Sequence, residues 1–188
     1  MRSGRFVSTW KTDNWNNESS NSTSIAIPTA SGAVYNYDVD WDNDGVFDDT
    51  ELTGEATHDY GVAGTYTISI RGDFPSIAFS TSGDREKLLS VDQWGDIAWE
   101  SMYQAFWGCS NLVINATDAP DLSNVTSAVF MFNGCTSLNS SLNHWDVSNV
   151  TVFFGMFNNA SAFNGDITGW DVSSATLMNL MFAGASSF

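Results

Sequence analysis

Residues 40–51 carry the densest chemistry in the chain, an acidic run that reads DWDNDGVFDDTE. The run fits the calcium-loop pattern D-x-[DN]-x-[DN]-G-x5-E at every fixed position. Calcium takes about six to eight oxygen ligands, and alternate residues of a tight loop can turn their carboxylates toward one ion. We therefore predict a Ca²⁺ site here, with Gly45 allowing the sharp turn. The predicted ligands are the side chains of Asp40, Asp42, Asp44, Asp48 and Glu51 and the backbone carbonyl of Val46.

Two alternatives stay open for this loop. Its flanks read as strands rather than as the two helices of an EF-hand, so Asp49 or Glu55 can replace Glu51 as the closing ligand. A solvated acidic turn without metal is the simpler interpretation, because Asp, Asn and Gly favour turns by themselves. Carboxylates packed this closely repel one another unless a cation lies among them, which favours the metal.

No part of the chain indicates catalysis. The chain has two histidines, and His58 lies in a Thr-His-Asp-Tyr corner where packing explains it. His144 precedes Trp145 in a repeated segment whose next copy has Gly169 at that place. A catalytic Cys/His pair needs a third group that orients the base, and none is indicated. We expect a protein that is not an enzyme.

The two cysteines share one context. Cys109 and Cys135 each lie in a Phe-x-Gly-Cys-x-x-Leu segment, so they should occupy equivalent positions in neighbouring repeats. Buried thiols that fill small apolar spaces are the expected state. Neighbouring repeats also lie close enough for a disulfide, and whether the two cysteines are bridged stays open.

The elements around these residues divide the chain in two. Near the C-terminus, DLSNVT (121–126), DVSNVT (146–151) and DVSSAT (171–176) recur every 25 residues. This period is typical of a leucine-rich repeat solenoid, and helical spacing from Val150 to Phe157 predicts one short helix per repeat. We expect these repeats over 106–188, truncated at the C-terminus, behind a cap and degenerate first repeat at 76–105.

Residues 1–75 are expected to form a small β-sandwich, because residues 34–41 and 64–70 alternate strictly between apolar and polar positions. Three motifs, VDW at 39–41, THDY at 57–60 and GTYTI at 64–68, resemble those of the PKD domain. That resemblance implies an immunoglobulin-like fold. The expected fold class is therefore mainly β with short helices: a PKD-like β-sandwich followed by a leucine-rich repeat solenoid of α/β type.

Residues 88–188 resemble the BspA-like leucine-rich repeat surface proteins of bacteria. The resemblance lies in WDVSNVT at 145–151 with Met156-Phe157, and in WDVSSAT at 170–176 with Met181-Phe182. It implies a cell-surface or secreted protein whose repeats mediate adhesion or partner binding. The family shares no catalytic residues, so none are carried over.

Charge narrows the range of partners. The chain has 22 acidic and 6 basic residues, a net charge of −16, and no Lys or Arg follows position 87. Nucleic acids and anionic membranes are excluded as partners because both require clustered basic residues. No apolar run is long enough to span a membrane, so no membrane insertion is expected in this chain.

These observations predict an extracellular or cell-surface recognition protein. Its partner would be a protein or a glycan on another surface, bound across the strand face of the repeats, and self-association stays open. Candidate ligand-binding residues are Trp145, Trp170 and His144. Two alternatives are a structural spacer or stalk within a longer repeat protein, and a carbohydrate-binding accessory module.

Overall fold

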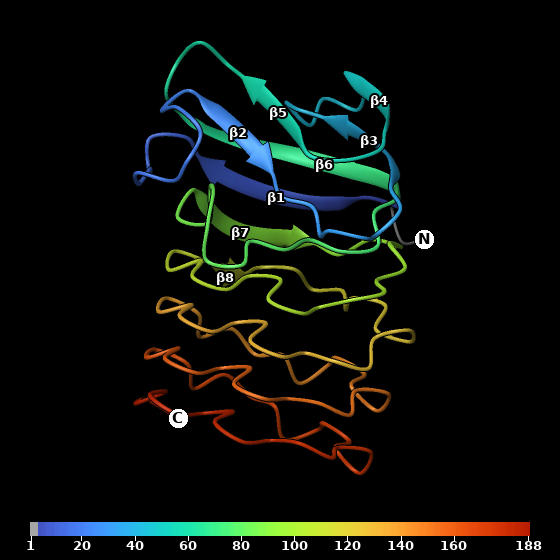
Figure 1. The fold of residues 1–188 in the computed structure, drawn as a ribbon, viewed down its shortest axis with the longest axis vertical. Helices are drawn as coiled ribbons and strands as arrows, with labels where there is room; N and C mark the ends of the chain where they lie inside the picture. The colour runs from blue at the N-terminus through green and yellow to red at the C-terminus, as the bar shows by residue number, and fades with distance from the viewer. Residues whose placement is uncertain (1–3) are drawn as a thin grey trace.

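The computed structural model describes residues 4–188, and they form two β-sheets and a series of stacked turns (Figure 1). The larger sheet has six strands in the order β4-β3-β6-β1-β7-β8, and the smaller sheet pairs β2 with β5. The strands are β1 (Phe6–Lys11), β2 (Ser24–Ile27), β3 (Asn36–Asp40), β4 (Asp49–Leu52), β5 (Ala56–Asp59), β6 (Thr65–Asp73), β7 (Leu88–Gln93) and β8 (Val113–Ile114).

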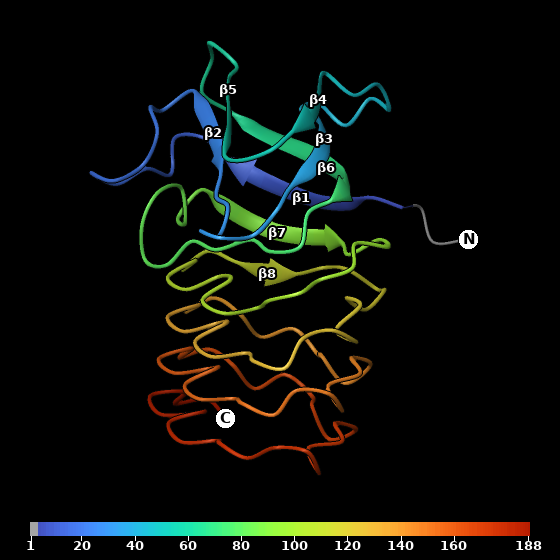
Figure 2. The same cartoon turned by 45° about the vertical axis from the view of Figure 1, so that its right-hand side comes forward.

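Strand β1 lies inside the large sheet and pairs antiparallel with both β6 and β7. Its side chains alternate between buried and half-buried, so Phe6 and Trp10 point into the core. The small sheet buries Ile25 and Ile27 as well. Figure 2 shows β2 and β5 on one side of the large sheet, which gives this part of the molecule two layers.

Below β8 the chain winds in turns that stack on one another (Figure 1). Each turn is tied to the next by backbone hydrogen bonds between residues about one repeat apart. The Ala128 amide donates to the Val152 carbonyl (2.8 Å), and the Phe153 amide donates to the Leu177 carbonyl (2.8 Å). Parallel bridges join residues 127, 152 and 177 in the same direction. The 25-residue spacing in the sequence is therefore the length of one turn of the stack.

A column of phenylalanine rings runs through the centre of the turns. Phe106, Phe132, Phe157 and Phe182 stack with successive ring centroids 5.6 Å apart and interplanar angles of 9°, 18° and 4°. Identical residues at one position of each repeat place these rings directly over one another. The column is the apolar core of the repeats.

The predicted fold class is wrong. The residues that the structure describes contain no helix, and the structure is all β, with one six-stranded sheet and one two-stranded sheet. The expected leucine-rich solenoid of strands and helices is therefore not found. The expected self-contained sandwich is not found either, because β7 and β8 extend the same sheet that contains β1 and β6.

Left-handed backbone explains why the helical spacing does not produce a helix. Gly155 (φ 61°) lies within the segment predicted as a helix, Asn159 (φ 57°) lies just after it, and both adopt positive φ. Phe130 (φ 54°) and Leu180 (φ 58°) occupy the positions equivalent to Gly155 in the neighbouring repeats, and they adopt positive φ too. A helix cannot continue through such residues. The chain instead forms successive tight turns, such as the one closed by the Met156 amide and the Phe153 carbonyl (3.1 Å).

The predicted division at 75/76 and 105/106 stays a prediction. β6 and β7 lie on either side of the first boundary, and both pair with β1. In the part of the chain that the structure describes, no helix has the length and apolar character needed to cross a membrane.

Both cysteines are free and fully buried in the described structure. Burial raises the pKa of the Cys109 thiol and of the Cys135 thiol, since a thiolate would lose its hydration. We expect neither thiol to react with a water-soluble disulfide reagent at mildly alkaline pH until the protein is unfolded in denaturant. Absorbance of the released thiolate measures this, and rapid reaction of the native protein would contradict it.

Candidate metal centre

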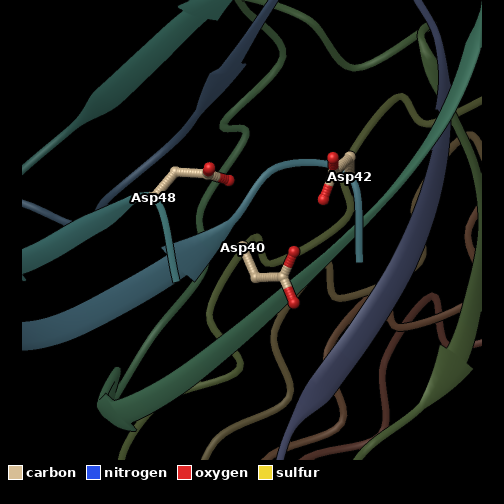
Figure 3. Close-up of side chains that lie close together, drawn as sticks. All are labelled: Asp40, Asp42 and Asp48. Atoms are coloured by element: carbon tan, nitrogen blue, oxygen red, sulfur yellow. The ribbon is translucent and has the colours of Figure 1, made fainter. Parts of the chain in front are cut away.

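The structure brings three predicted ligands together at the end of β3. Carboxylate oxygens of Asp40, Asp42 and Asp48 all lie within 4.8 Å of one another (Figure 3). Asp40 is fully buried, whereas Asp42 and Asp48 are exposed. Three hard oxygen donors at this separation can contact a single ion, and carboxylates are the ligands that Ca²⁺ prefers. The donor set therefore fits calcium, and the loop backbone can supply further oxygens.

Backbone amides hold the loop in this shape. The Asp40 carboxylate accepts from the Asp44 amide (3.1 Å) and from the Gly45 amide (2.9 Å), and the Asp48 carboxylate accepts from the Trp41 amide (2.8 Å). Gly45 has a φ of 100°, a conformation that costs glycine little. The acidic side chains are thus positioned by the loop itself before any ion binds.

The carboxylates of Asp44 and Glu51 lie outside this group of three, and the Val46 carbonyl stays a predicted ligand. The Asp44 carboxylate accepts from the Val46 amide (2.7 Å), which turns it toward its own backbone. Glu51 lies in β4, and its amide donates to Asp38 (3.0 Å). Of the two substitutes for Glu51, the Asp49 carboxylate accepts from the Trp41 indole (2.7 Å), and Glu55 lines a cavity that is described below.

Arg5 belongs to this site and was not found from the sequence. Its guanidinium lies 3.2 Å from the buried Asp40 carboxylate and 3.4 Å from the Gly45 carbonyl. The Phe47 ring contacts the guanidinium groups of both Arg5 (4.7 Å) and Arg71 (3.8 Å), measured from the guanidinium carbon to the ring centroid. Arg5 is 35 residues from Asp40 in the chain, so no local pattern connects the two. Arg5 already supplies part of the positive charge that a metal ion would bring.

We expect Arg5→Gln to raise calcium affinity by up to about fivefold. The pair is partly exposed, and such pairs contribute about 0.2–1 kcal/mol. Arg71→Gln is the matched control, because Arg71 stacks on the same Phe47 ring but bonds Asp38 instead of Asp40. Calorimetric titration with calcium measures both variants. An equal change in both, or no change in either, would contradict a competition between Arg5 and the ion.

Aromatic residues contact the loop at Trp41. The Trp41 ring stacks on His58 with centroids 5.1 Å apart, and the Tyr60 hydroxyl donates to the Trp41 carbonyl (2.7 Å). Burial raises the pKa of Tyr60, so this hydroxyl stays a donor at neutral pH. His58 therefore occupies a packing position, which is how the sequence motif was interpreted.

The three candidate ligand-binding residues of the repeats do not share one exposed surface. Trp145 is buried and lies edge-to-face with Trp94 (5.2 Å). Trp170 is half-buried and its indole donates to the Leu142 carbonyl (2.8 Å). His144 is exposed, with its Nε2 atom 3.0 Å from the Asp118 carbonyl oxygen. Of these three residues, His144 is exposed and Trp170 is partly exposed.

A different set of aromatic residues is partly exposed on the stacked turns. Trp107, Phe130 and Phe154 are half-buried, with ring centroids 4.8 Å and 5.2 Å apart. We call these three residues the aromatic row. Their spacing departs from 25 residues by one or two positions, which is why the repeat pattern did not indicate them.

Comparison with known families gives one match. Residues 100–188 match the family described as "Mycoplasma protein of unknown function, DUF285". The DUF285 match covers the stacked turns and the aromatic row. It does not include the acidic loop at residues 40–51, which we call the aspartate loop. No curated protein and no solved structure matches the chain.

Proposed function

We propose that this protein is a non-enzymatic recognition protein, exported to a bacterial cell surface or secreted. The observation that carries the proposal is the aromatic row. Aromatic side chains supply large contact area at low entropic cost and are enriched at the centres of interfaces. A partly exposed row on a column of stacked turns is a rigid site for a protein or a glycan on another surface.

Charge and family resemblance support this proposal. The stacked turns carry no Lys or Arg, so their contacts with a partner would rely on shape, hydrogen bonds and ring stacking. The repeat motifs resemble those of BspA-like surface proteins, and the first motifs resemble those of PKD domains of exported proteins. Both resemblances favour an extracellular setting.

An adhesion assay tests the proposal. Beads coated with the protein should bind monolayers of cultured epithelial cells, and the double variant Trp107→Ala/Phe154→Ala should bind several-fold less. Val62→Ala is the control, since Val62 is exposed at 67% but lies outside the repeats. Circular dichroism establishes that the variants are folded. Equal adhesion by the double variant and the unaltered protein, or no adhesion by either, would overturn the proposal.

We propose calcium as the cofactor, bound by Asp40, Asp42 and Asp48. The ion would neutralise three neighbouring carboxylates and hold the end of β3 against the start of β4. Its role is to stiffen the loop rather than to activate a substrate. Extracellular fluid supplies calcium at the millimolar level that weak sites of this kind need.

A structural spacer is the second candidate function. The phenylalanine column and the hydrogen-bond ladder between turns favour it, because both join each turn firmly to its neighbours. A spacer needs no exposed aromatic residues, so the variants of the aromatic row distinguish the two functions. A spacer would keep its function when the aromatic row is replaced.

A further inference from the structure

A cavity of about 820 Å³ shares no lining residue with the aspartate loop (residues 40–51) or with the aromatic row. Three segments form its walls: residues 28–33 after β2, residues 75–84 between β6 and β7, and residues 100–103. Small-molecule sites typically occupy about 300–1,000 Å³, so this cavity has room for one or two sugar rings.

Hydrogen bonds join the three walls. The Tyr35 hydroxyl donates to the Ser76 carbonyl (3.0 Å) and accepts from the Ala30 amide (2.7 Å), which links the first wall to the second. The Glu100 amide donates to the Pro75 carbonyl (2.8 Å), which links the second wall to the third. The cavity is therefore already formed without a ligand, and binding needs little reordering of the chain.

The lining indicates what kind of molecule fits. Glu55 and Glu100 provide exposed carboxylates, and alanine, glycine and serine leave space along the walls. None of the described residues that line the cavity is Lys, Arg or His, so an anion would find no counter-charge. Asp84 also lines the cavity, but its carboxylate is paired with buried Lys87 (3.1 Å). Tyr103, exposed at 50%, offers a ring against which a flat apolar face can stack.

Ser76 is the most informative residue of the wall. It is 2% exposed, and within residues 4–188 its hydroxyl has no hydrogen-bond partner. A buried polar group without a partner costs about 1–3 kcal/mol of stability. Backbone strain lies nearby, because Ser80 (φ 48°) and Thr81 (φ 68°) are consecutive left-handed residues. Such costs concentrate at functional sites.

We propose that this cavity binds a neutral sugar. The ring would stack on Tyr103, and its hydroxyl groups would donate to Glu55 and Glu100. The site shares no residue with the aromatic row or with the three aspartates of the candidate metal centre, so it does not depend on the function proposed above.

Titration with neutral sugars tests the proposal. We would record amide NMR spectra of the full chain with glucose, galactose, mannose, N-acetylglucosamine and lactose, once with calcium and once with a chelator. At least one sugar should give saturable shifts at the cavity walls in both conditions. Tetramethylammonium and inorganic phosphate should give none. The proposal fails if no sugar shifts these signals, or if tetramethylammonium shifts them instead.

Two variants distinguish binding from folding. Tyr103→Ala should weaken sugar binding about two- to tenfold, as expected for loss of one stacked aromatic contact. Trp15→Ala, which removes another exposed aromatic residue outside the cavity, should leave binding unchanged. Unchanged sugar binding by Tyr103→Ala, or an equal loss in Trp15→Ala, would overturn the proposal.

Discussion

We expect saturating calcium to raise the melting temperature of this protein by about 5–10 °C. An ion that binds only the folded chain stabilises it by about 2.7 kcal/mol at one hundred times its dissociation constant. For a chain of this length, each kcal/mol corresponds to about 2–4 °C. Differential scanning calorimetry with calcium, and then with a chelator, measures the shift.

Charge-removing variants of the loop establish where the ion binds. Asp42→Asn and Asp48→Asn should abolish the rise, and asparagine at position 48 can still accept from the Trp41 amide. Asp73→Asn removes one exposed carboxylate elsewhere and should keep the rise. The chain has a net charge of −16, so any dication also screens its self-repulsion. An equal rise with magnesium, or in the loop variants, would show screening instead of a specific site.

Phe157→Ala lowers the free energy of unfolding by about 3–5 kcal/mol. Phe157 is fully buried, with the Phe132 and Phe182 rings 5.6 Å away on either side and the Phe163 ring at 4.0 Å. Its removal costs both apolar burial and the cavity left in the column. The melting temperature should fall by about 6–20 °C.

Phe188→Ala is the matched control for this substitution. Phe188 stacks on Phe163 and Phe182 but is 54% exposed, so its loss leaves no closed cavity. We expect a cost below about 1 kcal/mol, since surface substitutions rarely exceed this. Urea unfolding followed by circular dichroism compares the two variants. Equal costs for Phe157→Ala and Phe188→Ala would contradict a core centred on the phenylalanine column.

The repeat period was predictable from the sequence, and the structure of each repeat was not. Identical residues 25 positions apart must occupy equivalent places, and Phe132, Phe157 and Phe182 stack as this requires. The same residues also fit helical spacing, which led to the wrong prediction of a helix. Backbone geometry decided against a helix, because non-glycine residues such as Phe130 and Leu180 adopt positive φ.

The aspartate loop was also only partly predictable from the sequence. Its local pattern was sufficient to place Asp40, Asp42 and Asp48 in one candidate site, because a tight turn brings alternate side chains together. The pattern could not show that the carboxylates of Glu51 and Asp44 lie outside the cluster. The position of Glu51 depends on where β4 begins, and that of Asp44 depends on its hydrogen bond with the Val46 amide. Arg5 joins the loop only because β1 and β3 both pair with β6.

By itself, the sequence determined which residues are periodic, which are charged and which loop is acidic, since these properties depend on neighbours along the chain. Only the tertiary structure decided the exposure of each aromatic ring, the partner of Arg5 and the cavity around Ser76. Each of these depends on contacts between segments far apart in the sequence, and no short pattern of residue types records such contacts.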